Sequence, residues 1–208
     1  KMLDIEALAF EGEGTGNIIR SDYPGVLTQY LPVAITNQQF RLETYNGFDG
    51  ALAAGKSLEV VNALSGWVPH FCHLMRLSKG RVRMSMALRI EEGAGFTVQL
   101  RDPELWMAAL GPTVDFTSGG GIAVNGKELM KIPLGMWFRI EVELELGAAR
   151  KDHAFVLRVW LPGEKTSREF AGLPFKRGFR KLGWVGFMSG SVGGKRYYVD
   201  DFKVEPVR

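Results

Sequence analysis

The sequence predicts an all-β protein that forms a sandwich of two antiparallel sheets, a jelly roll. Apolar and polar residues alternate with a period of two along several segments, and glycine-rich turns separate these segments. No amphipathic helix longer than about three turns competes with this pattern. Glycine makes up 26 of the 208 residues, or one residue in eight, whereas it makes up roughly 7% of typical proteins. This excess indicates many tight turns. Because neither an internal repeat nor a linker interrupts the chain, we expect one domain over residues 1–208.

Four segments are predicted to be strands with one buried and one solvent-facing side. In chain order they are residues 81–90, 96–101, 138–146 and 155–161. In the first of them Val82, Met84 and Met86 alternate with Arg83 and Ser85, and the other three follow the same rule. One apolar and one polar side is typical of antiparallel sheets.

Turn signals mark where these strands end. Glycine-rich or Pro-Gly sequences lie at residues 92–95, 119–121, 133–135, 162–163 and 193–194. The pair Asn125-Gly126 lies between residues 122–124 and 128–132, and such a pair favours a two-residue hairpin. We therefore expect a hairpin at this point.

The composition excludes several classes of protein. The 26 basic and 23 acidic residues give a net charge of +3, which is too small to indicate a dedicated nucleic-acid-binding protein. The single cysteine, Cys72, excludes an intrachain disulfide and a cysteine-rich metal cluster. No apolar run approaches the roughly 20 residues that span a bilayer, so we expect no membrane span.

Three stretches resemble concanavalin A-like, laminin-G-type jelly-roll domains. Residues 134–142 place Trp137 after a Pro/Gly turn at the start of an alternating strand, and the C-terminal stretch, with residues 184–189 and then 197–204, resembles the closing strands of that class. Residues 8–12 resemble its first strand, which pairs with the last. The resemblance covers the start of the chain and most of it from about Gly80, whereas residues 25–69 match no known pattern.

This resemblance implies a carbohydrate-active or carbohydrate-binding accessory module of an exported bacterial protein, which is secreted, periplasmic or on the cell surface. We expect non-catalytic recognition of a polysaccharide or other glycan on the concave face. Many unrelated domains share these motifs, so two other functions stay open. One is a glycoside hydrolase or polysaccharide lyase, and the other is a structural or adhesive module that binds protein.

The enzyme alternative depends on Glu141, Glu143 and Glu145. Alternate residues of a strand share a face with Cα atoms roughly 6.5–7 Å apart, so their carboxyl groups can approach the ~5–5.5 Å of a retaining glycosidase. The string also resembles the catalytic strand of laminarinase-type hydrolases. That resemblance implies a nucleophile at Glu141 and a general acid at Glu145, whereas Glu143 replaces the aspartate of the family. The other interpretation is a solvated strand face whose charges meet arginines or water.

A binding site for sugars pairs a flat aromatic ring with amide, carboxylate or guanidinium groups. Trp160 falls in the exposed phase of its strand, and polar residues line the solvent-facing side of strand 96–101. The candidate ligand-binding residues are Thr97, Gln99, Arg101, Trp106, Arg158 and Trp160. Alternatively, Trp160 belongs to the core under a further layer.

If the last strand alternates regularly, Asp200 lies on the same side as the apolar Tyr198, Phe202 and Val204, which is the core side. A carboxylate on a core face is costly unless it is paired or bound to a metal. In the jelly rolls that this chain resembles, an aspartate at this point often helps to hold a structural calcium. The resemblance therefore implies a calcium site that includes Glu11, Asp200 and Asp201. A salt bridge of Asp200 is the alternative.

A basic cluster near the C-terminus offers a further candidate site. It consists of Lys176, Arg177, Arg180 and Lys181, with Lys195 and Arg196 on a second loop. Guanidinium groups match the geometry of sulfate and carboxylate, so the cluster fits anionic sugars, but it also fits a pair of solvated loops.

Overall fold

The computed structural model describes residues 40–45, 55–62, 70–102, 109–148, 152–191 and 195–207. Side chains are described for Val60 and, within these ranges, from Met75 onward. The regular elements of these residues are all strands, and no helix among them is long and apolar enough to cross a membrane.

The thirteen strands follow one another with short connections over much of the chain. They are β1 (Phe40–Tyr45), β2 (Gly55–Asn62), β3 (His70–Leu77), β4 (Gly80–Ile90), β5 (Phe96–Arg101), β6 (Leu110–Phe116), β7 (Gly121–Val124), β8 (Lys127–Lys131), β9 (Trp137–Leu146), β10 (Ala154–Trp160), β11 (Arg168–Pro174), β12 (Leu182–Ser189) and β13 (Lys195–Pro206). The four strands predicted from alternation correspond to β4, β5, β9 and β10 within one residue at each end.

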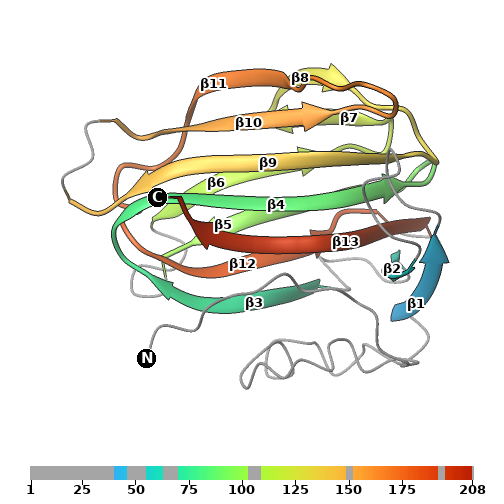
Figure 1. The fold of residues 1–208 in the computed structure, drawn as a ribbon, viewed down its shortest axis with the longest axis horizontal. Coiled ribbons are helices and arrows are strands. Elements are labelled where there is room, and N and C mark those ends of the chain that lie inside the picture. Colours follow the sequence, from blue (N-terminus) through green and yellow to red (C-terminus); the bar gives the residue numbers. More distant parts are fainter. Residues whose placement is uncertain are drawn as a thin grey trace.

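The strands form two antiparallel sheets that pack face to face, which confirms the predicted sandwich. The seven-stranded sheet has the order β1-β2-β13-β4-β9-β10-β11, and the six-stranded sheet has the order β3-β12-β5-β6-β7-β8. In Figure 1 the strands β13, β4, β9 and β10 face the viewer, and β12, β5 and β6 lie behind them. Sequence neighbours are often in different sheets, so the outer faces are assembled from distant parts of the chain.

The core lies between the sheets and is built from the apolar side of each strand. On β4 and β9 the inward residues, among them Met84, Leu88 and Ile140, are at most 3% exposed. Aromatic rings join the two layers, since Phe96 of β5 stacks on Tyr197 of β13 with ring centroids 3.8 Å apart. This burial confirms the phase of the alternation and directs the polar side of each strand outward.

The predicted hairpin at Asn125-Gly126 connects β7 and β8. Both residues have positive φ, 51° for Asn125 and 77° for Gly126, as a tight two-residue turn requires. The amide nitrogen of the Asn125 side chain also donates a hydrogen bond of 2.9 Å to the carbonyl oxygen of Pro174. The turn is therefore tied to the end of β11, which belongs to the other sheet.

The prediction that Asp200 lies on the core side of its strand is wrong, because β13 contains a bulge. The register against β4 shifts between Asp200 and Lys203, and Asp201 has a positive φ of 46°. Before the bulge Tyr197 and Val199 point into the core, and after it Phe202 and Val204 do so. Because the bulge adds one residue, Asp200 lies on the outer side of the sheet instead of the core side.

Candidate functional site

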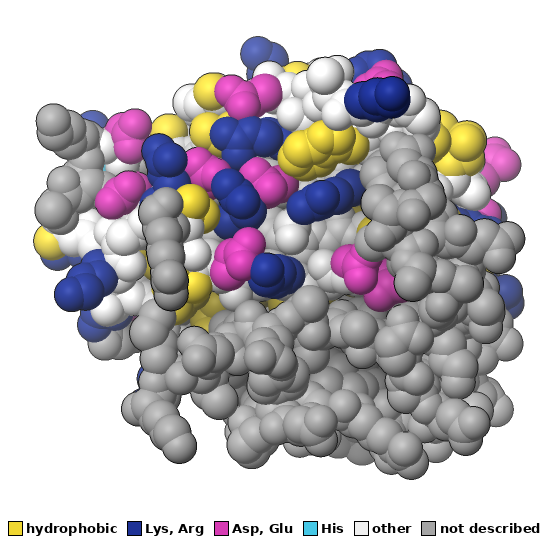
Figure 2. All heavy atoms as spheres, in the orientation of Figure 1, with side chains coloured by type: hydrophobic (Ala, Val, Ile, Leu, Met, Phe, Trp, Pro, Cys, Tyr) yellow, Lys and Arg dark blue, Asp and Glu magenta, His cyan; other side chains and the backbone are white. Residues whose placement is uncertain are grey.

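The outer face of the seven-stranded sheet gathers most of the charged side chains of the central strands. Cross-strand register sets them in rows, because directly opposed residues of antiparallel strands share a face. One row contains Arg89 of β4 opposite Trp137 of β9, and the next contains Arg139 of β9 opposite Trp160 of β10. A third row brings Glu141 of β9 opposite Arg158 of β10. Figure 2 shows this face, on which basic and acidic side chains alternate beside a hydrophobic area.

Arg158 is the centre of an ion cluster on this face. Its Nη1 atom lies 2.7 Å from Oε1 of Glu141 and 3.2 Å from Oε2 of Glu143, and its Nε atom lies 2.7 Å from Oε2 of Glu169. These contacts join β9, β10 and β11 across the sheet. The hydrogen bond with Glu169 and those with the other two carboxylates raise the pKa of Arg158, although partial burial opposes the shift.

From β4, two further arginines complete this cluster. Arg83 contacts Glu141 at 3.4 Å and Glu143 at 3.3 Å, and Arg81 contacts Glu143 at 3.4 Å. Burial by itself raises the pKa of Glu143, but hydrogen bonds from Arg83 and Arg158 and the charges of Arg158 and Arg81 outweigh it, so the pKa is lowered. Glu143 therefore stays ionised in the folded protein at neutral pH.

The three candidate catalytic glutamates lie in different surroundings. Glu141 and Glu143 share a face, as expected, but both are buried and hold arginines on two sides. Glu145 lies further along the same face, opposite Arg81 in the register, and is exposed. Among the residues that the structure describes, it makes no ion pair. The structure thus places two of the three glutamates in a neutralised cluster and leaves the third in solvent.

An aromatic patch adjoins the ion cluster, and we call Trp137, Arg139 and Trp160 the indole–arginine patch. The guanidinium carbon of Arg139 lies 5.2 Å from the ring centroid of Trp160. Trp137 precedes Arg139 by two residues on the same face of β9. Both indoles are half-buried and rest against the core, whereas Arg139 is exposed. Trp160 therefore lies on the outer face, as its strand phase predicted, and not between the sheets.

A second cation–aromatic contact extends the patch toward β13. The guanidinium carbon of Arg89 lies 4.8 Å from the ring centroid of Tyr198, whose ring is 6.4 Å from that of Trp137. Arg89 also pairs with Glu91 at 2.6 Å. Sequence reasoning did not select Trp137 or Arg139 for binding. Alternation does place them on the solvent-facing side, but only the register sets them beside Trp160.

The other predicted ligand-binding residues occupy the opposite outer surface. Thr97, Gln99 and Arg101 lie on the outer side of β5, in the six-stranded sheet, while their neighbours Phe96, Val98 and Leu100 point into the core. The whole sandwich separates them from Trp160. One groove cannot contain both groups, because they face away from each other. Trp106 lies outside the described residues.

A compact polar network occupies that second surface. Nε of Arg101 donates to Oε1 of Gln99 at 2.6 Å, and Nε2 of Gln99 donates to Oγ1 of Thr113 at 3.2 Å. The Arg101 guanidinium lies 4.2 Å from the ring centroid of Trp184. Arg101 and Gln99 are only 6% and 7% exposed. A ligand on this surface would thus find these two polar groups already engaged and largely buried.

The structure describes two of the three candidate calcium ligands, Asp200 and Asp201. Asp200 is 2% exposed, and its Oδ1 accepts a hydrogen bond of 2.7 Å from the backbone nitrogen of Asp201, across the bulge. Glu11 lies outside the described residues, as do residues 8–12 as a whole. Within the described part of the chain no three His, Cys, Asp or Glu side chains are grouped to hold a metal ion. Because calcium prefers six to eight oxygen ligands, Asp200 and Asp201 do not make a site by themselves.

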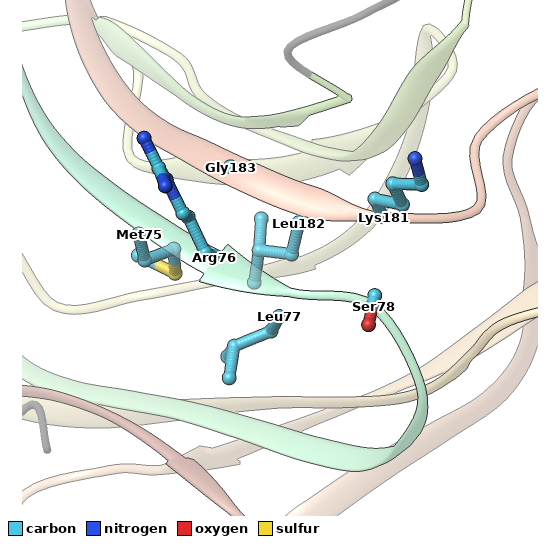
Figure 3. A pocket seen from close by; sticks show the side chains of 7 residues that line it. All are labelled: Met75, Arg76, Leu77, Ser78, Lys181, Leu182 and Gly183. Atoms are coloured by element: carbon cyan, nitrogen blue, oxygen red, sulfur yellow. The ribbon is translucent and has the colours of Figure 1, made fainter. Parts of the chain in front are cut away.

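A hollow of about 350 Å³ lies at the edge of the six-stranded sheet, between the end of β3 and the start of β12. Two residues of β3, Met75 and Arg76, oppose the single Gly183 of β12 because the register shifts there. Figure 3 shows Arg76 and Lys181 on two sides of this hollow. Lys181 belongs to the basic cluster found in the sequence, and its backbone nitrogen donates to Asp102 at 3.1 Å. The hollow lies in the other sheet from the indole–arginine patch.

Comparison with known proteins supports the fold. No family model and no curated protein matches the chain. Among solved structures, the catalytic domain of a glycoside hydrolase family 131 protein from Coprinopsis cinerea is similar at 11% identity and a TM-score of 0.54, over 96% of this chain and 93% of that one. Basic winged bean lectin with Tn-antigen is similar at 12% identity and a TM-score of 0.50, over 80% and 92%.

A sialidase is also similar, at 10% identity and a TM-score of 0.50, and the similarity covers 82% of this chain but 17% of the sialidase. At such identities the likeness concerns the fold alone. The expected concanavalin A-like fold of lectins and glycosidases is confirmed at that level. Because a lectin and a glycoside hydrolase both have it, the fold leaves the function to be decided by the site.

Proposed function

We propose that this chain, a concanavalin A-like sandwich by its fold, is a non-catalytic carbohydrate-binding module with its site on the outer face of the seven-stranded sheet. The observation that carries the proposal is the indole–arginine patch. Two half-buried indoles, with an exposed guanidinium over the ring of one of them, combine the flat apolar surface and the hydrogen-bond donors that a sugar ring requires. Of the predicted ligand-binding residues the proposal keeps Trp160, and it adds Trp137 and Arg139. Arg158 instead holds the neighbouring ion cluster together.

The contacts of Glu141 and Glu143 weigh against the glycosidase alternative. A general acid must be protonated near the working pH, which requires a raised pKa. The pKa of Glu143 is instead lowered by its arginines, so Glu143 itself does not suit this role, which the family resemblance assigns to Glu145. Both carboxylates already accept hydrogen bonds from Nη1 of Arg158, so a substrate would have to displace an ion pair to reach them.

The lectin bound to Tn-antigen supports a carbohydrate ligand by fold alone, and the sugar must be identified by experiment. Export by a bacterium remains a prediction from the sequence. A structural calcium involving Glu11, Asp200 and Asp201 likewise stays a prediction, with no role in the proposed site.

Affinity gel electrophoresis against a panel of soluble polysaccharides tests the proposal. We expect at least one polysaccharide to retard the protein, with Kd on the order of 10 µM–1 mM, because an open face buries little area. Trp160→Ala should abolish the retardation, and Trp160→Phe should retain part of it. Thr97→Ala, on the opposite surface, serves as the control and should behave as wild type.

Four results would count against the proposal. Equal retardation of wild type and Trp160→Ala would remove the patch from the site. Loss of binding in Thr97→Ala alone would move the site to the other sheet. Hydrolysis of a polysaccharide that Glu141→Gln abolishes would establish the enzyme alternative, and no binding to any polysaccharide would favour a protein-binding module.

A further inference from the structure

Charge pairing distinguishes one arginine of the central strands β4, β9 and β10 from the other arginines of these strands. The arginines of β4, β9 and β10 are Arg81, Arg83, Arg89, Arg139 and Arg158. Four of them lie within 3.4 Å of a glutamate oxygen. Arg139 is exposed and makes no ion pair with any residue that the structure describes. Its charge is thus available to a ligand.

Arg139 is also held in a defined position. Its guanidinium lies over the ring of Trp160, at 5.2 Å from the centroid. A guanidinium that is attracted to a ring face by its charge keeps N–H donors that can bind a further partner. These donors form a fork that matches the two oxygens of a carboxylate or sulfate group. Because the indole already orients the group, less side-chain entropy is lost when an anion binds.

The glutamates beside the patch do not offset this charge. Glu141 follows Arg139 by two residues on the same face, but its carboxylate contacts Arg83 and Arg158. Glu143 contacts the same two arginines and also Arg81. The ion cluster is therefore neutralised internally, and an anion at Arg139 meets little repulsion from it.

We propose that the indole–arginine patch selects acidic glycans, with a carboxylate or sulfate group of the sugar paired to Arg139 and a sugar ring packed on an indole. This inference rests on the proposed carbohydrate-binding function and specifies its ligand class. It gives Arg139 the role of a specificity-determining residue, and gives Trp160 the two roles of stacking surface and support for the guanidinium.

Titration of the folded protein with matched charged and neutral probes tests this inference. The probes are polygalacturonate and its fully methyl-esterified form, which share a backbone and differ in charge, together with a sulfated galactan and its desulfated form. Inorganic sulfate at equal ionic strength shows whether an anion without a sugar ring binds. The proteins are wild type, Arg139→Ala, Arg139→Lys and the charge-matched control Arg76→Ala, which lies at the edge of the other sheet.

We expect wild type to bind one charged probe roughly tenfold more tightly than its neutral partner, as one charge-assisted fork at an exposed site allows. The identity of that probe distinguishes carboxylate from sulfate. Arg139→Ala should remove the preference, Arg139→Lys should keep a smaller one, and Arg76→Ala should keep all of it. Thermal unfolding of each variant verifies that it is folded.

Equal affinity for charged and neutral probes, with Trp160→Ala still losing both, would overturn the acidic preference and leave the proposed function intact. Equal weakening in Arg139→Ala and Arg76→Ala would also overturn it, because the preference would then come from overall charge. If inorganic sulfate binds as tightly as the sulfated galactan, the sugar ring contributes nothing to binding, and the proposed selection of acidic glycans is overturned. No binding to any probe or to the wider panel would overturn both proposals.

Discussion

Nη1 of Arg158 on β10 lies 3.2 Å from Oε2 of Glu143 on β9, although the residue opposite Arg158 in the register is Glu141. The contact is therefore diagonal, and it lets one guanidinium hold two carboxylates of the neighbouring strand. Side chains of opposed and diagonal residues on one face lie within reach of each other. The pair thus connects two rows of the outer face as well as two strands.

Replacing Glu143 should make stability at acidic pH less sensitive to pH. Its pKa in the folded state is below the unfolded value of about 4.3, so its stabilisation is present above roughly pH 5 and is lost as the pH falls through the folded value. We expect Glu143→Gln to lower the free energy of unfolding by about 1–2 kcal/mol at pH 7. The difference from wild type should shrink below about pH 4.

Urea denaturation at pH 7, 5 and 3.5 measures the difference in the free energy of unfolding between Glu143→Gln and wild type. Urea is uncharged, so it does not screen the ion cluster as a salt would. Glu145→Gln is the matched control, since Glu145 is on the same face of the same strand but is exposed. It should change stability by less than about 0.5 kcal/mol at every pH. A difference for Glu143→Gln that stays constant with pH would show that its ionisation does not stabilise the fold.

Gly186 of β12 allows the Trp184 ring to lie across the strand. A Cβ atom at position 186 would fall 1.8 Å from a carbon of that ring, so the ring must move. We expect Gly186→Ala to destabilise the protein by about 1–3 kcal/mol and to disturb the contact of Trp184 with Arg101. Thermal unfolding should show a lower Tm by several degrees, with a change in tryptophan fluorescence.

Gly119→Ala is the control for this substitution. A Cβ atom there would meet only the Lys131 side chain, at 3.9 Å, which is an ordinary contact. Its Tm should equal that of wild type. If Gly186→Ala also unfolds at the wild-type temperature, the ring of Trp184 has another position available at little cost.

The β7–β8 turn depends on Asn125 in two ways, through its positive φ and through its bond to Pro174. Alanine at this position should cost about 1–2 kcal/mol, because a Cβ-bearing residue without a local hydrogen bond disfavours this conformation. Asn125→Gly keeps the backbone conformation and loses only the side-chain bond, so it should cost about 0.5–1 kcal/mol. Chemical denaturation of both variants separates the two effects, and equal losses would assign the whole effect to the bond.

The predicted calcium site has a direct thermal test. Calcium at a hundredfold excess over Kd would stabilise the folded form by about 2.7 kcal/mol, so removing it with a chelator should lower Tm by roughly 5–10 °C. Asp200→Asn should reproduce that loss and respond no further to chelator. If neither chelator nor added calcium moves the Tm of wild type, the burial of Asp200 is explained by its place at the bulge of β13, without a metal.

Local sequence determined the strands, the turn at Asn125-Gly126 and the side of each strand that faces the core. These features depend on residues within a few positions of one another, as the alternation around Met84 and Ile140 illustrates. The general fold class followed from them. The side of the sheet on which Asp200 lies could not be predicted in this way, because a bulge adds one residue to β13 and nothing in the alternation marks it.

Only the tertiary structure decided which outer surface each polar row occupies. Trp160 and Thr97 both have solvent-facing phases, yet they lie on opposite sides of the sandwich because β10 and β5 belong to different sheets. The neighbours of Arg139 and Glu141 were likewise set by the pairing of β9 with β4 and β10, strands that are distant in sequence or separated by a turn. Strand phase is a local property with a period of two, whereas sheet membership and register arise from long-range packing, and the site depends on both.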